Sequence, residues 1–185
     1  MPQSFDREAA LREIIDRELN MFLATPNEGG ISVCQQRPET FRVMRRMTHD
    51  PLDDATLAFY LADLQAAAAA GRNLMVEKYA RMDDRLPPLS TSPLLDEIAD
   101  AELAFLKEAS ILFPYVIRRS GGDMFRRYLR CELETLSQNT LESYAREVRR
   151  ARSVGKNMAV ERHRCLACLL GQGSLEEYEA ARTQK

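Results

Sequence analysis

Two nine-residue stretches of this chain share one pattern: GRNLMVEKY at residues 71–79 returns as GKNMAVERH at residues 155–163. Gly, Asn, Val and Glu recur at the same spacing. When the chain is aligned with itself at the spacing of these two stretches, Leu11 matches Leu95 and residues 11–82 align with residues 95–166 without a gap. Of these 72 aligned positions, 18 are identical. Internal similarity at a fixed spacing indicates repeated structural units. We therefore expect a pseudo-symmetric fold that is built from two copies.

The apolar residues of each copy recur at helical spacing. We expect helices at about 5–24, 38–48 and 52–83 in the first copy, and at about 93–112, 121–134 and 137–169 in the second. Ser174 and Glu177 have the spacing of a capping box, which predicts a last short helix at about 174–182. No segment shows sustained alternation of apolar and polar residues. The sequence therefore predicts one all-α domain over 1–185, a helical bundle of two three-helix copies at about 5–84 and 93–169.

The composition is that of an ordinary globular protein, with 45% apolar and 29% charged residues among 185. The net charge of −2 gives no reason to expect nucleic acid as a partner. The first residues are charged and lack the apolar core of a signal peptide, and no stretch is apolar for long enough to form a membrane helix. The four cysteines are then best interpreted as reduced thiols. We expect a soluble, cytoplasmic protein with no membrane contact.

Gly71 falls inside the third predicted helix of the first copy, and Gly155 takes its place in the second. A glycine inside a helix costs about 1 kcal/mol relative to alanine, so its presence needs a reason. It lies on an apolar seam whose members are three or four residues apart: Leu57, Tyr60, Leu64, Ala67, Gly71 and Leu74. A close helix crossing or a kink would explain the glycine. A break in the helix is the alternative.

Identical polar residues in both copies predict a buried polar network. On a continuous helix, Asn73 and Glu77 lie one turn apart and face away from the seam. Arg42 and Arg46, which are also one turn apart, are their expected partners, and Glu18 would close the network. Two interpretations stay open. These five residues hold three helices in register, or they form the polar floor of a ligand pocket.

The positions that differ between the copies are a second place to look for a site. Polar or permissive residues of the first copy become apolar or bulky in the second: Asn20, Gly29-Gly30, Cys34-Gln35, Arg45 and His49 face Ala104, Phe113-Pro114, Arg118-Arg119, Leu129 and Leu133. They lie on the first helix, on the loop PNEGGISVCQQRP (26–38) and on the short helix that follows. If the protein has a site, we expect it in this region.

This loop has one feature that is typical of an anion site. The backbone N–H groups of Gly29-Gly30 could hold an anion that Arg42, Arg45 and Arg46 would neutralise. However, the loop matches no complete phosphate-loop pattern, and a glycine pair is more often a simple turn. Both interpretations stay open.

The cysteines and histidines indicate little chemistry. Cys34 could be a nucleophile if an arginine lowered its pKa, but a lone cysteine is more often a small buried apolar residue. His49 is interpreted as a cap or a surface residue. His163, Cys165 and Cys168 do not converge on one face of a helix, so we expect no metal site.

The run ELNMF…NEGGISVCQQRPETFRVMRR (18–46) combines a Met-Phe helix, a Gly-Gly-x-x-x-Cys-Gln loop and a Thr-Phe-x-x-Met-Arg helix. Through this run and through PYVIRRSGGDMFRRYLRCELETLS…LESY (114–144), the chain resembles a bacterial family known only as a domain of unknown function (number 4125). The resemblance covers most of the chain and implies a fold, but no activity. Many relatives continue after the Met-Arg helix with Ser-Gln-x-x-x-Trp, whereas this chain continues with MTHDPL and contains no Trp.

The sequence favours a binding protein without chemistry of its own, which takes a small anionic ligand or a protein partner and uses no cofactor. One alternative is an enzyme that works from the Cys34 loop with Glu18, Arg42 and Arg45. Another is a purely structural homodimer. The candidate ligand-binding residues are Glu18, Asn20, Cys34, Gln35, Arg42, Arg45, Arg46, Asn73 and Glu77. No residue is assigned a catalytic role.

Overall fold

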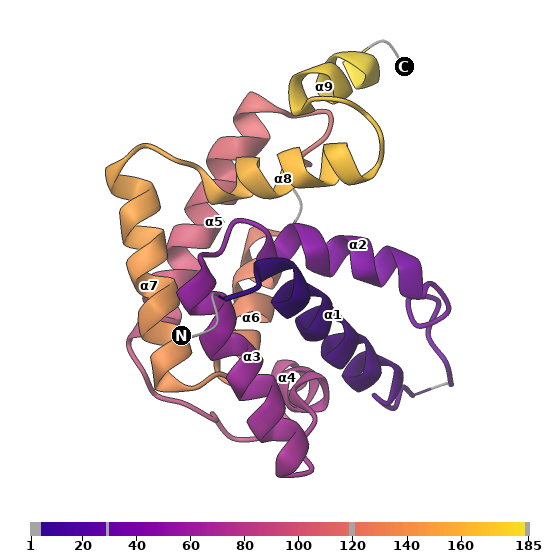
Figure 1. The fold of residues 1–185 in the computed structure, drawn as a ribbon, viewed down its shortest axis with the longest axis vertical. Coiled ribbons are helices and arrows are strands. Elements are labelled where there is room, and N and C mark those ends of the chain that lie inside the picture. The colour runs from indigo at the N-terminus through magenta and orange to yellow at the C-terminus, as the bar shows by residue number, and fades with distance from the viewer. Residues whose placement is uncertain (1–4, 29, 119–120, 184–185) are drawn as a thin grey trace.

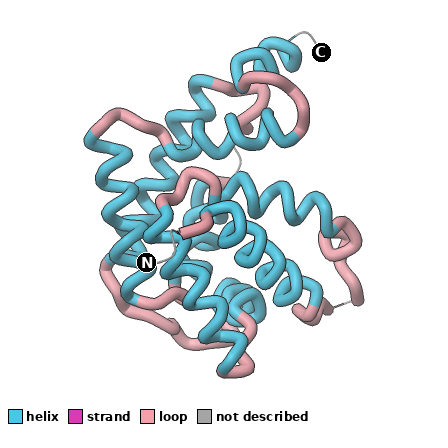
Figure 2. Tube along the Cα trace, in the orientation of Figure 1, coloured by secondary structure: helices cyan, strands magenta, loops and turns pink. Residues whose placement is uncertain are grey.

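The computed structural model describes residues 5–28, 30–118 and 121–183, and within these ranges the chain forms nine α-helices and no strand (Figure 2). The predicted all-α class is confirmed. In the same ranges, no helix is both long enough and apolar enough to pass through a lipid bilayer.

Four helices form the first half of the molecule: α1 (Arg7–Leu23), α2 (Pro38–His49), α3 (Asp54–Ala69) and α4 (Leu74–Met82). α1 begins where the carboxylate of Asp6 accepts a hydrogen bond from the N–H of Ala9. α2 begins at Pro38, because the fixed φ of proline suits the first helical position and its missing N–H is not needed there. The predicted helices at 5–24 and 38–48 are confirmed to within about two residues.

Five helices form the second half: α5 (Leu94–Leu112), α6 (Gly122–Leu133), α7 (Gln138–Ser153), α8 (Met158–Leu169) and α9 (Leu175–Thr183). The predicted capping box is present at α9. Ser174 Oγ accepts from the N–H of Glu177 at 3.1 Å, and the Glu177 carboxylate accepts from the N–H of Ser174 at 2.7 Å. α9 lies at one end of the molecule, next to α8 (Figure 1).

The first helix of each half packs against the helices that follow it. α1 contacts α2, α3 and α4, and α5 contacts α6, α7 and α8 (Figure 1). Three helix pairs then join the halves: α3 with α7, α4 with α6, and α2 with α8. The fourth helix of each half therefore packs on the second helix of the other half. One apolar core runs through both, with Leu11, Ile14, Leu57, Leu64, Leu95 and Ile98 among its fully buried members.

The two long helices expected at 52–83 and 137–169 are each broken in two, so the prediction of three helices in each copy is wrong. Gly71 has a left-handed backbone with φ of 65°, and Gly155 has φ of 69°. The N–H groups of Gly71 and Arg72 donate to the carbonyls of Ala68 and Ala67, the Schellman pattern that ends a helix. Gly71 is exposed and no atom lies within 4 Å of where its Cβ would be, so it does not serve a close helix crossing.

Asn73 begins the helix that follows this break. Its side-chain oxygen accepts hydrogen bonds from the first turn of α4, and its Nδ2 donates to the carbonyl of Met21 at 2.8 Å. Asn157 caps α8 in the same way, and its Nδ2 donates to the carbonyl of Phe105 at 3.0 Å. In each repeated stretch, the Gly thus ends one helix and the Asn begins the next. The side chain of the same Asn also joins that next helix to the first helix of its half.

We expect Gly71→Ala to lower the free energy of unfolding by about 1–2 kcal/mol, because a Cβ is strained at positive φ even in open space. Urea unfolding measures the change. Gly122→Ala is the matched control, since Gly122 has no positive φ and an added Cβ would make only ordinary contact, 3.4 Å from Leu103 Cδ1. Equal losses in both variants would contradict the role given to Gly71.

Candidate functional site

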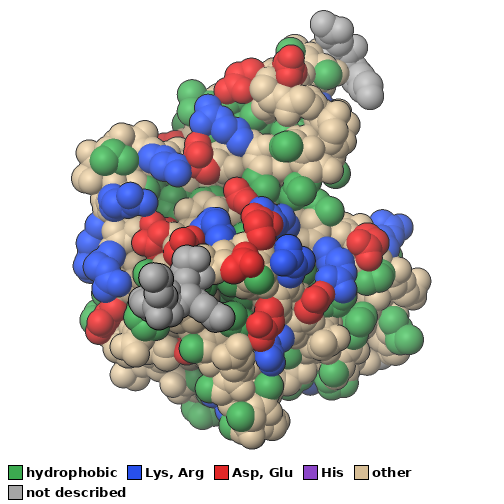
Figure 3. All heavy atoms as spheres, viewed as in Figure 1, with side chains coloured by type: hydrophobic (Ala, Val, Ile, Leu, Met, Phe, Trp, Pro, Cys, Tyr) green, Lys and Arg blue, Asp and Glu red, His purple; other side chains and the backbone are tan. Residues whose placement is uncertain are grey.

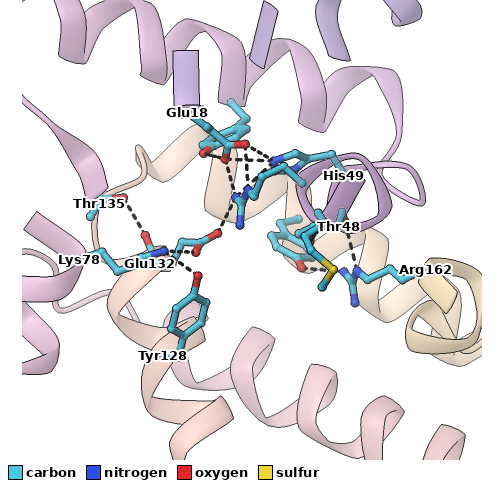
Figure 4. A network of polar contacts seen from close by, with 12 residues as sticks. Glu18, Thr48, His49, Lys78, Tyr128, Glu132, Thr135 and Arg162 are labelled. Atoms are coloured by element: carbon cyan, nitrogen blue, oxygen red, sulfur yellow. Dashed lines mark hydrogen bonds and ion pairs between the residues drawn. The ribbon is translucent and has the colours of Figure 1, made fainter. Parts of the chain in front are cut away.

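Glu18 on α1 is fully buried and collects polar side chains from two neighbouring helices. Its Oε2 accepts from Arg45 Nε at 2.9 Å, and its Oε1 accepts from the hydroxyl of Tyr60 at 2.6 Å. His49 Nε2 lies 3.0 Å from Oε2. Helices α1, α2 and α3 therefore meet at one carboxylate (Figure 4).

Glu132 on α6 extends these contacts into the second half. Arg45 Nη2 donates to Glu132 Oε1 at 3.0 Å, and Lys78 Nζ on α4 donates to Oε2 at 3.0 Å. Lys78 also donates to the hydroxyl of Tyr128 at 2.8 Å. We call this set the central network (Figure 4): Glu18, Arg45, His49, Tyr60, Lys78, Tyr128 and Glu132.

A second buried carboxylate, Glu102 on α5, takes the position of the second half that aligns with Glu18. Its Oε1 accepts from the hydroxyl of Tyr144 and from Arg162 Nη2, both at 2.8 Å. Arg162 Nε also donates to the carbonyl of Thr48 at 3.2 Å. Glu18 is thus neutralised by an arginine of α2, whereas Glu102 is neutralised by an arginine of α8.

Ion pairing keeps the central network charged. Burial raises the pKa of Glu132, but attraction to Arg45 and Lys78 outweighs it and lowers that pKa to about 2. Burial also raises the pKa of Glu18, and Arg45 together with His49 brings it well below its usual range. Burial lowers the pKa of Lys78, but Glu132 raises it above its ordinary value. Two carboxylates face two cations, so the network is balanced when His49 is neutral.

A cavity of about 40 Å³ lies beside the central network, between the two halves. One side of its wall comes from α2, α3 and the turn between them, and includes His49 and Tyr60. The other side comes from α6, α7 and the turn between them. Because a water needs roughly 10–15 Å³ of such volume, the cavity suits a molecule of a few non-hydrogen atoms.

His49 has the one buried side-chain polar atom without a hydrogen-bond partner in the part of the chain that the structure describes, its Nδ1. A carboxylate only accepts, so His49 Nε2 carries the hydrogen that it shares with Glu18. A neutral ring then leaves a lone pair on Nδ1. The interpretation of His49 as a cap or surface residue is wrong, because α2 turns it inward and leaves it 4% exposed.

The structure brings Glu18 and Arg45 together, but it sends Arg42 and Arg46 elsewhere. Arg42 pairs with Asp16, and Arg46 Nη1 donates to Glu8 at 2.7 Å. Successive residues of a helix point about 100° apart around its axis. When Arg45 faces Glu18, Arg46 on the same helix therefore points away from Glu18 and toward the surface. Acidic and basic side chains lie next to one another across the surface seen in Figure 3.

Asn73 and Glu77 also lie outside the central network. Asn73 caps α4, and Glu77 accepts from Arg72 Nη2 at 2.7 Å. Their predicted directions assumed a continuous helix, and the chain breaks at Gly71. The predicted network of Glu18, Arg42, Arg46, Asn73 and Glu77 therefore does not form.

Gln35 organises the loop between α1 and α2. Its Nε2 donates to the carbonyls of Phe22 and Thr25, both at 2.9 Å, and the residue is buried. Its neighbour Cys34 is exposed, so the interpretation of Cys34 as a buried apolar residue is wrong. The loop is held in place by its glutamine and presents its cysteine to solvent.

The remaining sequence candidates form no cluster with the central network. Asn20 is exposed near the end of α1, and Gly29 of the expected anion cradle lies outside the described residues. His163 Nδ1 lies 2.7 Å from the carbonyl oxygen of Ala159. Within the described ranges, no three His, Cys, Asp or Glu side chains are grouped as metal ligands.

Sequence reasoning missed four members of the central network, Tyr60, Lys78, Tyr128 and Glu132, although two of them left a signal. Tyr60 recurs at the aligned position of the second half, and Lys78 is matched there by an arginine. Glu132 left no signal, because it faces a threonine in the first copy and no local pattern marks it.

The family model described as "Protein of unknown function (DUF4125)" matches residues 8–180. No curated protein and no solved structure matches the chain. The matched range contains the whole central network and the whole cavity wall.

Proposed function

The chain belongs to the family described as a protein of unknown function (DUF4125), and because that description carries no activity, we propose a function from the geometry. In this proposal, the protein binds a small polar molecule in the cavity between its halves and performs no chemistry on it. One observation carries this proposal. His49 lines that cavity, and its Nδ1 is a buried polar atom without a partner among the described residues. Such an atom costs free energy unless a bound molecule satisfies it.

The charges around the cavity favour an uncharged ligand over the anionic one expected from the sequence. Arg45 already contacts two carboxylates, and Lys78 contacts one. The third nearby cation, Arg162, is paired with Glu102. An anion would have to compete with these buried carboxylates, whereas a neutral molecule leaves every pair intact.

The same pairing argues against catalysis. A general base works best when its pKa lies near the working pH. The pKa values of Glu18 and Glu132 are held far below that range by Arg45 and Lys78. Cys34, the nucleophile of the enzyme alternative, lies on an exposed loop. No complete set of nucleophile, base and orienting group supports the enzyme alternative within the described residues.

We also infer that the two halves are copies of one unit. The contact of Tyr60 with Glu18 recurs in the second half, at the same offset along the chain, as that of Tyr144 with Glu102. The cavity wall is made of matched positions from both halves: Thr48 and Glu132, His49 and Leu133, Leu52 and Leu136, Thr56 and Thr140, Tyr60 and Tyr144. On this inference the cavity lies on the axis that relates the copies, and its symmetry is broken where Thr48 faces Glu132 and His49 faces Leu133.

A thermal-shift screen of uncharged molecules of about three to six non-hydrogen atoms tests the proposal. A ligand at about 100 times its Kd stabilises by about 2.7 kcal/mol, which raises the Tm of a chain of this size by roughly 5–10 °C. Leu136→Phe places a larger side chain in the cavity wall, fills the cavity and should abolish the ligand-induced rise in Tm. Leu170→Phe, at a residue that is 46% exposed, is the matched control and should retain it. Equal shifts in both variants would place binding elsewhere, and a screen without hits would remove the proposed function.

A further inference from the structure

The hydroxyl groups around the cavity have few hydrogens left to donate. Four of them already donate to protein acceptors: Thr48 to the carbonyl of Met44, Tyr60 to Glu18, Thr140 to Asp63 and Tyr144 to Glu102. Thr56 shares a hydrogen bond with Ser143 at 2.8 Å. His49 Nδ1 alone among these wall atoms has no partner in the described residues. The wall therefore offers acceptors, and it needs a donor.

The opposite side of the cavity presents three leucines, Leu129, Leu133 and Leu136, beside polar residues that already have partners, and Leu52 adds to the apolar surface from the first half. Leu129 and Leu133 take the positions of the second half that align with Arg45 and His49, so the polar pair of one half faces leucines of the other. Glu132, the charged residue on this side, already accepts from Arg45 and Lys78. Among the described wall residues, His49 is therefore the one whose buried polar atom a ligand would newly satisfy.

We infer that the cavity takes a small, uncharged, amphipathic molecule whose hydrogen-bond donor contacts His49 Nδ1 and whose apolar part packs against the leucines. This inference rests on the proposed function and names the ligand class for that same site. A neutral imidazole that donates from Nε2 can only accept at Nδ1. A molecule with acceptors alone would leave Nδ1 unpaired and would bring a further acceptor that the neutral ring cannot satisfy.

Protonation of His49 reverses this requirement, because Nδ1 then carries a hydrogen and donates. Charged and titratable groups lie around the ring on seven helices: Glu18 on α1, Arg45 on α2, Tyr60 on α3, Lys78 on α4, Glu132 on α6, Tyr144 on α7 and Arg162 on α8. Each of them has a protein partner other than His49. The change of ligand preference therefore follows His49 itself.

Isopropanol and acetone form a matched pair of probes, since both have four non-hydrogen atoms and a similar size, but acetone cannot donate. The chain has two histidines, so the ¹⁵N spectrum of its imidazoles is simple to read, and His163→Gln assigns it. With His49 neutral, isopropanol should shift the Nδ1 resonance in a saturable way and bind about tenfold more tightly than acetone. Once the spectrum shows an imidazolium at His49, Nδ1 donates, and the advantage of isopropanol should disappear because its hydroxyl and the carbonyl of acetone both accept.

The outcomes separate the two proposals. Equal affinity for both probes while His49 is neutral, or an unchanged preference for isopropanol once His49 is protonated, would overturn the ligand class and leave the proposed function standing. Binding of neither probe to the folded full chain would overturn both. His49→Gln is the matched variant, because its amide can still donate to Glu18 while Nδ1 is removed. Loss of the preference for isopropanol in this variant supports the inference, and its retention would overturn it.

Discussion

Glu18→Ala is expected to lower the free energy of unfolding by about 3–5 kcal/mol, because removal of one partner of a buried ion pair strands the other. Arg45, whose side chain is 8% exposed, would keep Glu132 as its only carboxylate. His49 and Tyr60 would also lose the acceptor for their hydrogen bonds. The substitution thus leaves several buried donors without partners at once.

Urea unfolding followed by circular dichroism measures this loss. Glu13→Ala is the matched control, since Glu13 lies on the same helix and also accepts from an arginine, but its side chain is 42% exposed. A surface pair of this kind contributes about 0–1 kcal/mol. If both variants lost the same small amount, the central network would not contribute to stability as its burial indicates.

Glu132→Gln is expected to cost on the order of 3 kcal/mol at pH 7, and this cost should vanish in acid. Burial raises the pKa of Glu132, but Arg45 and Lys78 lower it from 4.5 to about 2 in the folded protein. The unfolded chain therefore binds more protons than the folded chain between these values, and stability rises with pH there. The contribution of the Glu132 charge is complete above about pH 5 and is lost as the pH falls toward 2.

Unfolding curves of the natural chain and of Glu132→Gln, recorded from pH 7 to pH 2, test this expectation. The gap between their free energies of unfolding should close through the acid range. Glu176→Gln is the matched control, because Glu176 is 58% exposed and contacts only Arg164. A gap that stayed constant with pH would show that Glu132 contributes by packing and not by its charge.

Helix positions could be predicted well because they depend on local signals. Pro38 at the start of α2 and the capping box at Ser174 are read from a few adjacent residues. The break at Gly71 carried a local signal too. Glycine is typical of a helix end, and Asn73, two residues later, is of a type that often begins a helix. The apolar seam predicted one continuous helix in spite of this signal. The seam runs through the break because α3 and α4 pack on the same core.

Partners within the site could not be predicted, because carboxylates and arginines are abundant and nothing local matches them. Arg42, Arg45 and Arg46 lie close together on one helix, yet Arg45 alone points to Glu18. Comparison of the two aligned segments of the chain did single out Arg45 and His49 as positions that differ, and both belong to the central network. That comparison carried no information on which side chain each of them contacts.

The sequence by itself determined the all-α class, the ends of most helices and the constant offset at which buried residues recur, because these depend on periodicity and capping along the chain. The tertiary structure alone decided that Glu132 and Lys78 complete a charge network begun by Glu18, and that His49 borders a cavity. These residues come from α1, α2, α4 and α6. These side chains are removed from water only because the two halves pack on each other. Burial makes their pairing necessary, and it leaves His49 Nδ1 as a buried nitrogen without a partner among the described residues.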